Sequence, residues 1–585
     1  MVYLLLLPFI GLSDAKDTDV ESIPVWSSHE PIHLARYSLL SLSCTAFAYL
    51  IWQLFFRYYN HLRQLSTFGH DNQRYFETPT NEVLAWLKEH LIYAPLFKVR
   101  HNREFRGWKN IHMGTLPSRF HSLLILGMLS LNFGLCLVNV PYQNRDSTAK
   151  AIRKSTGTVA TANLIPLVLM AGRHNPLIRA LRVPFDTWML LHRWLGRIVV
   201  LESLVHTMTW GISYAEAENW RTVAAALVGG SFLRDGFVAT CILTVILLQS
   251  PSPIRHAFYE TFLHLHFVLA ALTMAFLWVH LDGMHSQNYL FTAIILWISE
   301  RTVRIVILIY RNYGPNSTMA NVEILHGDAM RITLRLARPW TFKPGQHLYL
   351  YIPAVGWWTS HPFSIAWSEN THSDEEGLPS SEDDLLGNRQ STISLLVQRR
   401  AGMTDHLFRK ASKGSTTYRA LTEGPYGNIH SLDSYGTVLL FAGGLGIAHQ
   451  ISFVRHLVSG FAEGTLATRR IFLVWVVRSS AHLEWVRSWI TSILEMDRQR
   501  DILRIMLFIT QPQSTKEIQE CSMTIPIFPG RPNVETLIDM EIGSQIGAMG
   551  VMVCGSGSLS DDVRHVCRRR QAASNIDFIE ESFSW

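Results

Sequence analysis

The sequence predicts a multi-domain membrane protein, in which a bundle of about seven transmembrane α-helices precedes an antiparallel β-barrel and an α/β domain. Its 585 residues are too many for one compact core, since a single domain holds about 150 residues. Hydrophobic residues make up 48% of the chain and charged residues only 17%, against about 25% charged residues in soluble proteins. Long apolar runs end near residue 312, and short β-branched runs separated by Gly and Pro follow.

Seven apolar windows are long enough to cross a bilayer, which requires about 20 residues. The loop between the first two windows is rich in Lys and Arg, which favours a cytosolic location for this loop and for the C-terminal half. We therefore expect a multi-pass protein of the plasma membrane with its C-terminal domains in the cytosol, although the basic stretch 145–154 would then lie outside. The windows are residues 36–56, 120–140, 157–171, 187–211, 236–250, 258–281 and 288–309.

The composition also limits the partners. The net charge of +6 is spread along the chain without a clustered basic face, so nucleic acid is not expected as a partner, whereas membrane lipid is. Six scattered cysteines give no disulfide framework.

Five segments are expected from these patterns. Residues 368–389, rich in Ser, Asp and Glu, are expected to form a disordered surface insertion in the barrel. The segments are a short extracellular N-terminal stretch that resembles a weak signal sequence (1–34), a transmembrane pair with a cytosolic loop (35–140), a second transmembrane domain (141–312), the barrel (313–434) and the α/β domain (435–585).

Four histidines lie within two of the predicted spans. His192 and His206 are 14 residues apart, and so are His266 and His280. Fourteen residues correspond to about 21 Å of helix rise and to nearly the same helix face. Each helix therefore presents two imidazoles at two depths, and two stacked haems with axial histidines from opposite helices fit this pattern. Alternatively, the imidazoles are hydrogen-bonded within an ordinary helical bundle; His264 is a less well aligned neighbour of His266.

Two stretches of the predicted barrel suit a flavin. His361-Pro362-Phe363-Ser364 follows a strand, and Arg399–Thr404 combines a Gly turn with cations and a hydroxyl. A flavin requires an apolar slot for its ring, polar groups at the ring edge and a cradle for its pyrophosphate. A turn with a buried aromatic and a solvated basic turn are the structural alternatives.

Three strand ends of the α/β domain suit a nicotinamide nucleotide. Gly443-Gly444-Leu445-Gly446 lies between a strand and a helix, where backbone N–H groups bind phosphate. Arg478 ends the next strand and is positioned to pair with a 2′-phosphate, and Cys554-Gly555 ends a third. Such strand ends meet in one crevice of a parallel sheet. Alternatively, Arg478 forms a surface ion pair and Cys554 is simply small and buried.

From about Ser155 to Trp585 the chain resembles the fungal ferric reductases of the transmembrane flavocytochrome b superfamily, which also contains the NADPH oxidases. The stretches that carry the resemblance are 169–176, 192–197, 259–266, His361–Ser364, Glu423–Gly427, Gly443–Gly446, Cys554–Gly557 and Glu580–Trp585.

The resemblance implies a ferredoxin–NADP reductase-like module fused to a membrane domain with two b-type haems, using FAD and NADPH as further cofactors. His192, His206, His266 and His280 would be the haem-iron ligands. His361, Pro362, Phe363 and Ser364 match the flavin-binding motif, Gly402, Met403 and Thr404 match its pyrophosphate contact, and Gly424 lies in a further matching stretch. Gly443, Gly444 and Gly446 match the nucleotide motif, Cys554 and Gly555 the pair beside the nicotinamide, and Trp585 or Phe583 the aromatic that covers the flavin.

We therefore predict an NADPH-dependent oxidoreductase that reduces extracellular ferric iron or ferric chelates, with cupric ion left open as an acceptor. A downstream iron uptake system would be a partner. The alternative within the same superfamily is a superoxide-generating NADPH oxidase, which differs in the final electron acceptor. A non-enzymatic transporter or receptor with a regulatory soluble half would contain neither flavin nor haem.

Overall fold

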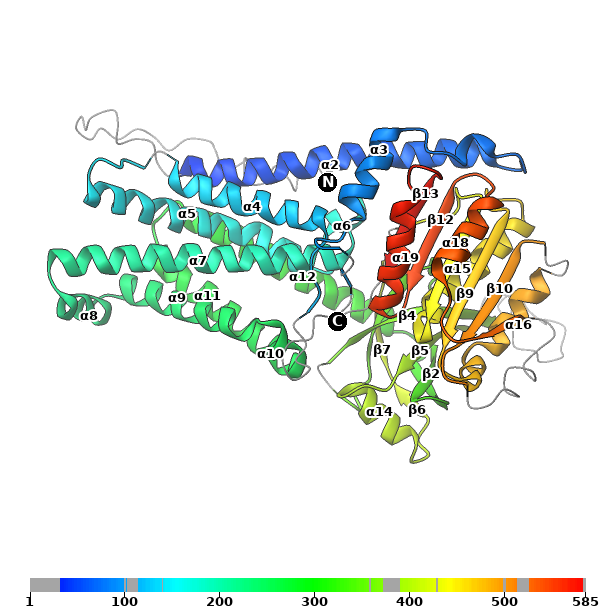
Figure 1. Cartoon of the computed structure of the whole chain (residues 1–585). Coiled ribbons are helices and arrows are strands. Elements are labelled where there is room, and N and C mark those ends of the chain that lie inside the picture. Colours follow the sequence, from blue (N-terminus) through cyan, green and yellow to red (C-terminus); the bar gives the residue numbers. More distant parts are fainter. Residues whose placement is uncertain are drawn as a thin grey trace. The chain divides into compact units, whose positions relative to one another are not determined.

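The computed structural model (Figure 1) describes residues 32–98, 101–102, 114–138, 140–356, 359–371, 390–427, 430–497, 501–512 and 525–581. These residues divide into two compact units. The helical unit contains the described residues up to Phe55 and those of His121–Val303. The soluble unit contains the described residues of Phe56–Glu104, Thr115–Phe120 and Arg304–Trp585.

A long helix occupies each of the seven apolar windows. Four of them, α2, α4, α9 and α11, are long and apolar enough to cross a membrane. The other three are more polar, so the number of spans stays a prediction. The long helices are α2 (Ile32–Thr67), α4 (Arg119–Leu137), α5 (Arg145–Ala171), α7 (Phe185–Ala217), α9 (Ser231–Gln249), α11 (Tyr259–His280) and α12 (Gln287–Asn312).

Helices α5 and α7 form the centre of the helical unit. The side chain of Asn144 caps α5 by accepting a hydrogen bond from the Asp146 N–H, with 3.1 Å between the nitrogen and the oxygen, a common helix-start device. Fully or almost fully buried small residues such as Val159, Ala162 and Val199 let the two helices approach closely. Short helices connect the long ones: α6 (Pro176–Leu181), α8 (Trp220–Gly229) and α10 (Ser252–Ala257).

The first part of the soluble unit is a seven-stranded antiparallel sheet with the order β6-β1-β2-β5-β4-β3-β7. On β2, Met330, Ile332 and Leu334 are fully buried, the alternation expected of a sheet with one face on a core. Helix α14 (Met403–Ala411) follows β5. The strands are β1 (Met319–Leu325), β2 (Ala329–Arg335), β3 (Gln346–Tyr351), β4 (His361–Thr371), β5 (Gln390–Gln398), β6 (Thr417–Arg419) and β7 (Leu421–Gly427).

One boundary in this sheet differs from the expectation. Strand β4 continues through Thr371, which is paired with Gln390 of β5. Residues 368–371 are therefore part of the sheet, because Ser368 and its neighbours extend the ladder with β5, and not part of an insertion. Residues 372–389 lie outside the described residues.

The second part is a six-stranded parallel sheet with the order β11-β10-β9-β8-β12-β13, as predicted from the alternation of strands and helices. Helices cover both faces: Val438 and Leu440 of β8 share a core with α15 and α16, and Leu439 and Phe441 share one with α18 and α19. The chain order reverses between β8 and β12, where α/β sheets bind ligands. The elements are β8 (Thr437–Gly443), η4 (Gly444–Gly446), α15 (Ile447–Ala462), β9 (Arg470–Val477), η5 (Ser480–Trp485), α16 (Arg487–Met496), β10 (Leu503–Ile509), β11 (Ile527–Pro529), α18 (Val534–Gly543), β12 (Met549–Cys554), α19 (Gly557–Arg569) and β13 (Ile576–Glu581).

An ion pair joins the end of α12 to the antiparallel sheet within the soluble unit. The guanidinium of Arg304 donates to both carboxylate oxygens of Glu423, at 2.9 and 3.1 Å. The hydroxyls of Tyr351 and Tyr426 donate to the same carboxylate at 2.9 and 2.5 Å. Glu423 is 1% exposed, so its charge depends on these donors.

Replacing Arg304 by Met should therefore destabilise the soluble unit by about 3–5 kcal/mol, because it leaves a buried carboxylate without its cation. Thermal unfolding of the full-length chain in detergent, followed by tryptophan fluorescence, measures this. Arg335→Met, at an exposed position on β2, is the control and should change stability by less than about 0.5 kcal/mol. Equal unfolding temperatures for the two variants would contradict the assignment.

Candidate cofactor sites

The four histidines of the predicted spans form two pairs between α7 and α11. The ring centroids of His192 and His266 are 6.3 Å apart, and those of His206 and His280 are also 6.3 Å apart. The planes of the two rings meet at 82° in one pair and 83° in the other. The two pairs thus repeat the same geometry at two levels of the helical unit.

Backbone carbonyl groups orient three of these imidazoles. His192 Nδ1 lies 2.9 Å from the carbonyl oxygen of Leu167, and His206 Nδ1 lies 2.8 Å from that of Arg153. On the other helix pair, His280 Nδ1 lies 2.7 Å from the carbonyl oxygen of Phe232. A carbonyl only accepts hydrogen bonds, so Nδ1 carries the proton in each case. Nε2 is therefore unprotonated and has a free lone pair. This is the arrangement usual for metal-ligating histidines.

Two glycines give the imidazoles room to reach these carbonyls. A Cβ atom on Gly157 would lie 2.6 Å from Nδ1 of His206, and one on Gly236 would lie 2.5 Å from Nδ1 of His280. Each glycine is four residues after the accepting carbonyl, at Arg153 and Phe232, and so lies directly beside it on the helix surface. The sequence pattern alone did not indicate a role for these glycines. The feature that could have indicated them is an isolated glycine inside a helical pattern, because such a glycine often allows close packing.

The spacing within each pair fits a haem. Two imidazole–metal bonds of about 2 Å each and two ring radii of about 1.1 Å each, from ring bonds of about 1.33 Å, place the centroids of two axial imidazoles roughly 6.2 Å apart. The observed value is 6.3 Å in both pairs. Unprotonated Nε2 atoms at His192, His206 and His280 are suitable donors, and with the spacing of both pairs these residues fit bis-imidazole ligation of two haems.

The pair of His192 and His266 differs from the other in one respect. Nδ1 of His266 is buried and has no hydrogen-bond partner among the described residues. His264, its neighbour on α11, lies on an exposed part of the helix, and its Nδ1 lies 2.7 Å from the carbonyl oxygen of Glu260. Helix α11 therefore turns His266, and not His264, toward α7.

The residues of the flavin motif lie on β4, in the centre of the antiparallel sheet. His361, Pro362, Phe363 and Ser364 are opposite Leu350, Tyr349, Leu348 and His347 of β3, in that order. On the other side of β3, Gly424 of β7 has a φ of 151°, and a Cβ atom there would lie 3.3 Å from the Cα of Leu348. The sheet thus holds Gly424 and the four motif residues close to one strand.

The predicted pyrophosphate contact is the start of α14. Gly402 precedes the helix with a φ of 89°, a conformation that favours glycine. Met403 is buried and packs into the core of the antiparallel sheet. The hydroxyl of Thr404 accepts a hydrogen bond from the N–H of Arg400 at 2.9 Å, and this closes the turn. The turn combines a helix start with the exposed Arg400, whereas Arg399 is paired with Asp405 and Asp328 at 2.8 and 3.4 Å.

The glycines of the nucleotide motif pack directly against the end of β12. A Cβ atom on Gly446 would overlap the carbonyl oxygen of Cys554, and one on Gly555 would lie 2.8 Å from the Cα of Gly443. Gly444 has a φ of 54°, and its carbonyl oxygen accepts a hydrogen bond from Trp475 Nε1 at 3.0 Å. Glycine is required here by close backbone approach, at the start of α15, where a phosphate would face backbone N–H groups.

Two further residues lie at the same carboxyl edge of the sheet. Gly443 is opposite Val476 of β9, and the exposed Arg478 follows two residues later. Cys554 is 2% exposed, and burial, with a smaller contribution from Glu581, raises the pKa of its thiol well above the ordinary value. The thiol therefore stays protonated at neutral pH. Phe583 and Trp585 lie outside the described residues.

Three protein families match successive parts of the chain. Residues 156–277 match the ferric reductase like transmembrane component, residues 315–430 an FAD-binding domain, and residues 435–568 the ferric reductase NAD binding domain. Each match covers one of the regions described above.

Similar proteins are fungal. Ferric reductase transmembrane component 3 of Saccharomyces cerevisiae is 27% identical, over 86% of this chain and 75% of that protein. Ferric/cupric reductase transmembrane component 1 of Candida albicans is 23% identical, over 90% of this chain and 71% of that protein. Among solved structures, the Amycolatopsis cytochrome P450 reductase GcoB is 20% identical over 46% of this chain and 71% of that chain, with a TM-score of 0.32.

The glycine beside His280 gives a direct test of the haem assignment. Gly236→Ala should displace the imidazole, because the new Cβ would lie 2.5 Å from its Nδ1, and should lower the haem-to-flavin ratio toward half of its original value. Absorption spectra of the purified chain measure the ratio. Gly211→Ala on α7, where an added Cβ meets nothing within 4 Å, should keep the original ratio, and an unchanged ratio in both variants would count against the assignment.

The contact between the two glycine loops gives a second test. Gly446→Ala should push the loops apart and raise the NADPH concentration needed for half-maximal flavin reduction by at least about tenfold, or about 1.4 kcal/mol. Flavin content should not change. Gly543→Ala, at a helical position with nothing within 4 Å of the added Cβ, serves as the control. Normal NADPH dependence in Gly446→Ala would exclude the proposed nucleotide site.

Proposed function

We infer that this chain is a ferric reductase of the fungal flavocytochrome b family, which transfers electrons from a nicotinamide nucleotide through FAD across a membrane to ferric iron. Its domains support this, because ferric reductase transmembrane, FAD-binding and NAD-binding domains follow one another in one polypeptide. The observation that carries the function is the pairing of histidines across α7 and α11 with 6.3 Å between ring centroids at both levels.

We propose two b-type haems, one between His192 and His266 and the other between His206 and His280. When bound, FAD would supply the conversion of a two-electron hydride from the nucleotide into the single electrons that a haem can take up. The chain's own contribution is to fix the imidazoles. Nδ1 hydrogen bonds to backbone carbonyls keep Nε2 unprotonated at His192, His206 and His280, so these nitrogens would be available to hold haem iron.

We propose NADPH as the electron donor. The backbone N–H groups around Gly443, Gly444 and Gly446 would hold the pyrophosphate at the start of α15. Arg478 would pair with the 2′-phosphate, a role that its exposed position at the end of β9 permits. Cys554 and Gly555 would line the nicotinamide side. Because burial keeps the Cys554 thiol protonated, it contributes packing and polarity there and no thiolate chemistry.

We propose that β4 and α14 hold the FAD. His361, Pro362, Phe363 and Ser364 would line its ring, with Gly424 beside them, and Gly402, Met403 and Thr404 would contact its pyrophosphate. The C-terminal Trp585 or Phe583 would cover the flavin until the nicotinamide displaces it. No general acid or base is needed for electron transfer to a metal ion.

We further propose that the acceptor is extracellular ferric iron or a ferric chelate, and that the soluble unit is cytosolic in a plasma-membrane protein that feeds an iron uptake system. Two of the similar fungal proteins carry names with both ferric and cupric ion, which supports testing cupric ion as a second acceptor. The basic loop after α2 supports the cytosolic placement.

Replacing His206 or His280 by Ala should abolish NADPH-driven ferric reduction at the outer face, because the haem between them loses an axial ligand. FAD content and flavin reduction by NADPH should remain. His264→Ala is the matched control on α11 and should retain activity. Ferrous iron and superoxide are measured together in membranes, and two haems per FAD are expected in the optical spectrum. Ferric reduction retained by haem-depleted protein, or superoxide as the main product, would contradict the proposal.

A further inference from the structure

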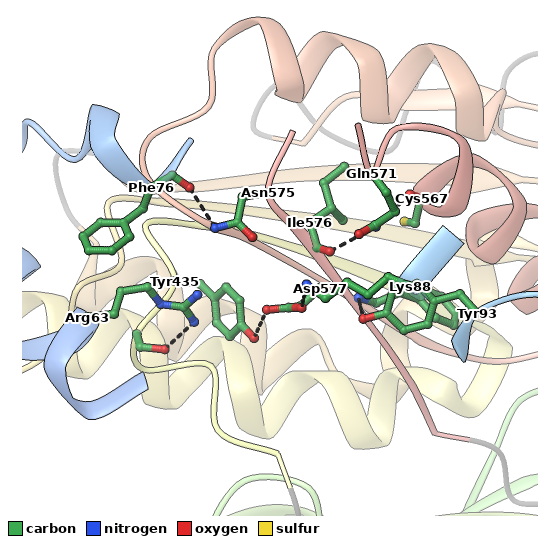
Figure 2. A network of polar contacts seen from close by, with 12 residues as sticks. Arg63, Phe76, Lys88, Tyr93, Tyr435, Cys567, Gln571, Asn575, Ile576 and Asp577 are labelled. Atoms are coloured by element: carbon green, nitrogen blue, oxygen red, sulfur yellow. Dashed lines mark hydrogen bonds and ion pairs between the residues drawn. The ribbon is translucent and has the colours of Figure 1, made fainter. Parts of the chain in front are cut away.

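The last strand of the parallel sheet has a partner from a distant part of the chain. Strand β13 lies at the edge of the sheet, and the residues that cover it come from the region between α2 and α4 (Figure 2). We call the described residues of 73–102 the edge segment. It contains η1 (Arg74–Phe76), α3 (Glu82–Leu87) and η2 (Lys88–Ile92), and none of the matched domain families includes it or β13.

The edge segment first satisfies backbone groups of the strand. The N–H of Asn575 donates to the carbonyl oxygen of Glu77 at 2.8 Å, and the Asn575 side chain donates to that of Phe76 at 3.1 Å. The N–H of Phe578 donates to the hydroxyl of Tyr93 at 3.2 Å. An exposed edge strand is open to unwanted pairing, and these contacts occupy the N–H groups of Asn575, just before β13, and of Phe578 within it.

A charged network then fixes the middle of β13. Lys88 Nζ lies 2.6 Å from one carboxylate oxygen of Asp577, and the hydroxyl of Tyr435 donates to the other at 2.7 Å. The guanidinium of Arg63 lies 4.3 Å from the centre of the Tyr435 ring and donates to Ser434 at 2.7 Å. Burial alone would raise the pKa of Asp577, but the cations Lys88 and Arg63 hold it at about 2, so the carboxylate is charged at neutral pH.

Asn102 binds the end of the strand. Its N–H donates to Asp561 at the start of α19, with 3.0 Å between nitrogen and oxygen. Its side-chain amide donates to Glu580, which also pairs with Arg564. In the ladder with β12, Glu580 is opposite Val553, and the next residue, Glu581, is opposite Cys554. The edge segment therefore binds β13 at Glu580, one residue before the position opposite Cys554 of the proposed nicotinamide site.

From these contacts we propose that the edge segment is a positioning element of the nucleotide-binding sheet, in which Lys88 and Asn102 set the place of β13 and of the neighbouring β12. The consequence for electron transfer rests on the proposed function, in which Cys554 lines the nicotinamide side of the nucleotide site. Glu581 is opposite Cys554 in the ladder between β13 and β12, so a shift of β13 displaces the strand that carries Cys554.

Asn102→Ala and Lys88→Met in the full-length chain test this role. In both variants the rate of flavin reduction by NADPH should fall at least about tenfold, because a misplacement of about 1 Å can have an effect of this size. The FAD content and the haem spectrum should not change. Backbone amides of residues 576–581 should exchange with deuterium faster. Adding Asp577→Asn to Lys88→Met removes the carboxylate that has lost its lysine partner. The double variant should therefore regain most of the protection of residues 576–581 against deuterium exchange.

Asp71→Asn is the matched control. Asp71 lies just before the edge segment and pairs with Arg469 at 2.9 Å, but its side chain is 92% exposed and it does not touch β13 in any described contact. This variant should resemble the unmodified chain in both measurements.

Two results would overturn the proposal: wild-type exchange and flavin reduction in Asn102→Ala and Lys88→Met, or slower reduction that only parallels loss of FAD. If the flavin of the unmodified chain is not reduced by NADPH, the proposed function fails. Deuterium exchange of residues 576–581 still tests whether the edge segment holds β13 in place.

Discussion

The distance between α7 and α11 at the two histidine levels is the constraint on which the membrane half of the molecule depends. The proposed bis-imidazole sites would tolerate little variation in this distance, because two imidazoles would have to hold one haem iron between them. The distance between ring centroids is 6.3 Å in both pairs. Neighbouring helices hold three of the four imidazoles, because α5 accepts the Nδ1 hydrogen bonds of His192 and His206 and α9 accepts that of His280.

The hydrogen bonds to the imidazoles also explain a spacing of 14 residues on α5, a helix that carries none of the four histidines. The carbonyls that bind His206 and His192 belong to Arg153 and Leu167, which are themselves 14 residues apart on α5. Antiparallel helices at constant separation bring equivalent carbonyls to both levels. On α9 the carbonyl of Phe232 serves His280, while Nδ1 of His266 has no partner among the described residues. The two levels therefore have the same ligand spacing but different hydrogen bonding behind the ligands.

The order of elements and the ligand spacing could be predicted because they follow from local patterns: apolar length, histidines at a helical spacing and glycines at strand ends. The roles of Gly157 and Gly236 could not, since a glycine shows a packing role only when the facing helix is known. The edge segment was missed for the same reason, as Lys88 and Asp577 meet across 489 positions of sequence. The basic residues of the edge segment, Lys88 among them, indicated only that this loop is cytosolic.

The soluble unit shows why such a distant contact matters to a doubly wound sheet. Ligands bind at the switch point between β8 and β12, and β12 is separated from the open edge by β13 alone. A weakly held edge strand would leave β12, and with it Cys554, free to move against the glycines that follow β8. Hydrogen bonds from Asn575 and Phe578 to the edge segment oppose this motion. The nucleotide crevice is therefore held from one side by the sheet itself and from the other by a segment that precedes the predicted haem helices in the sequence.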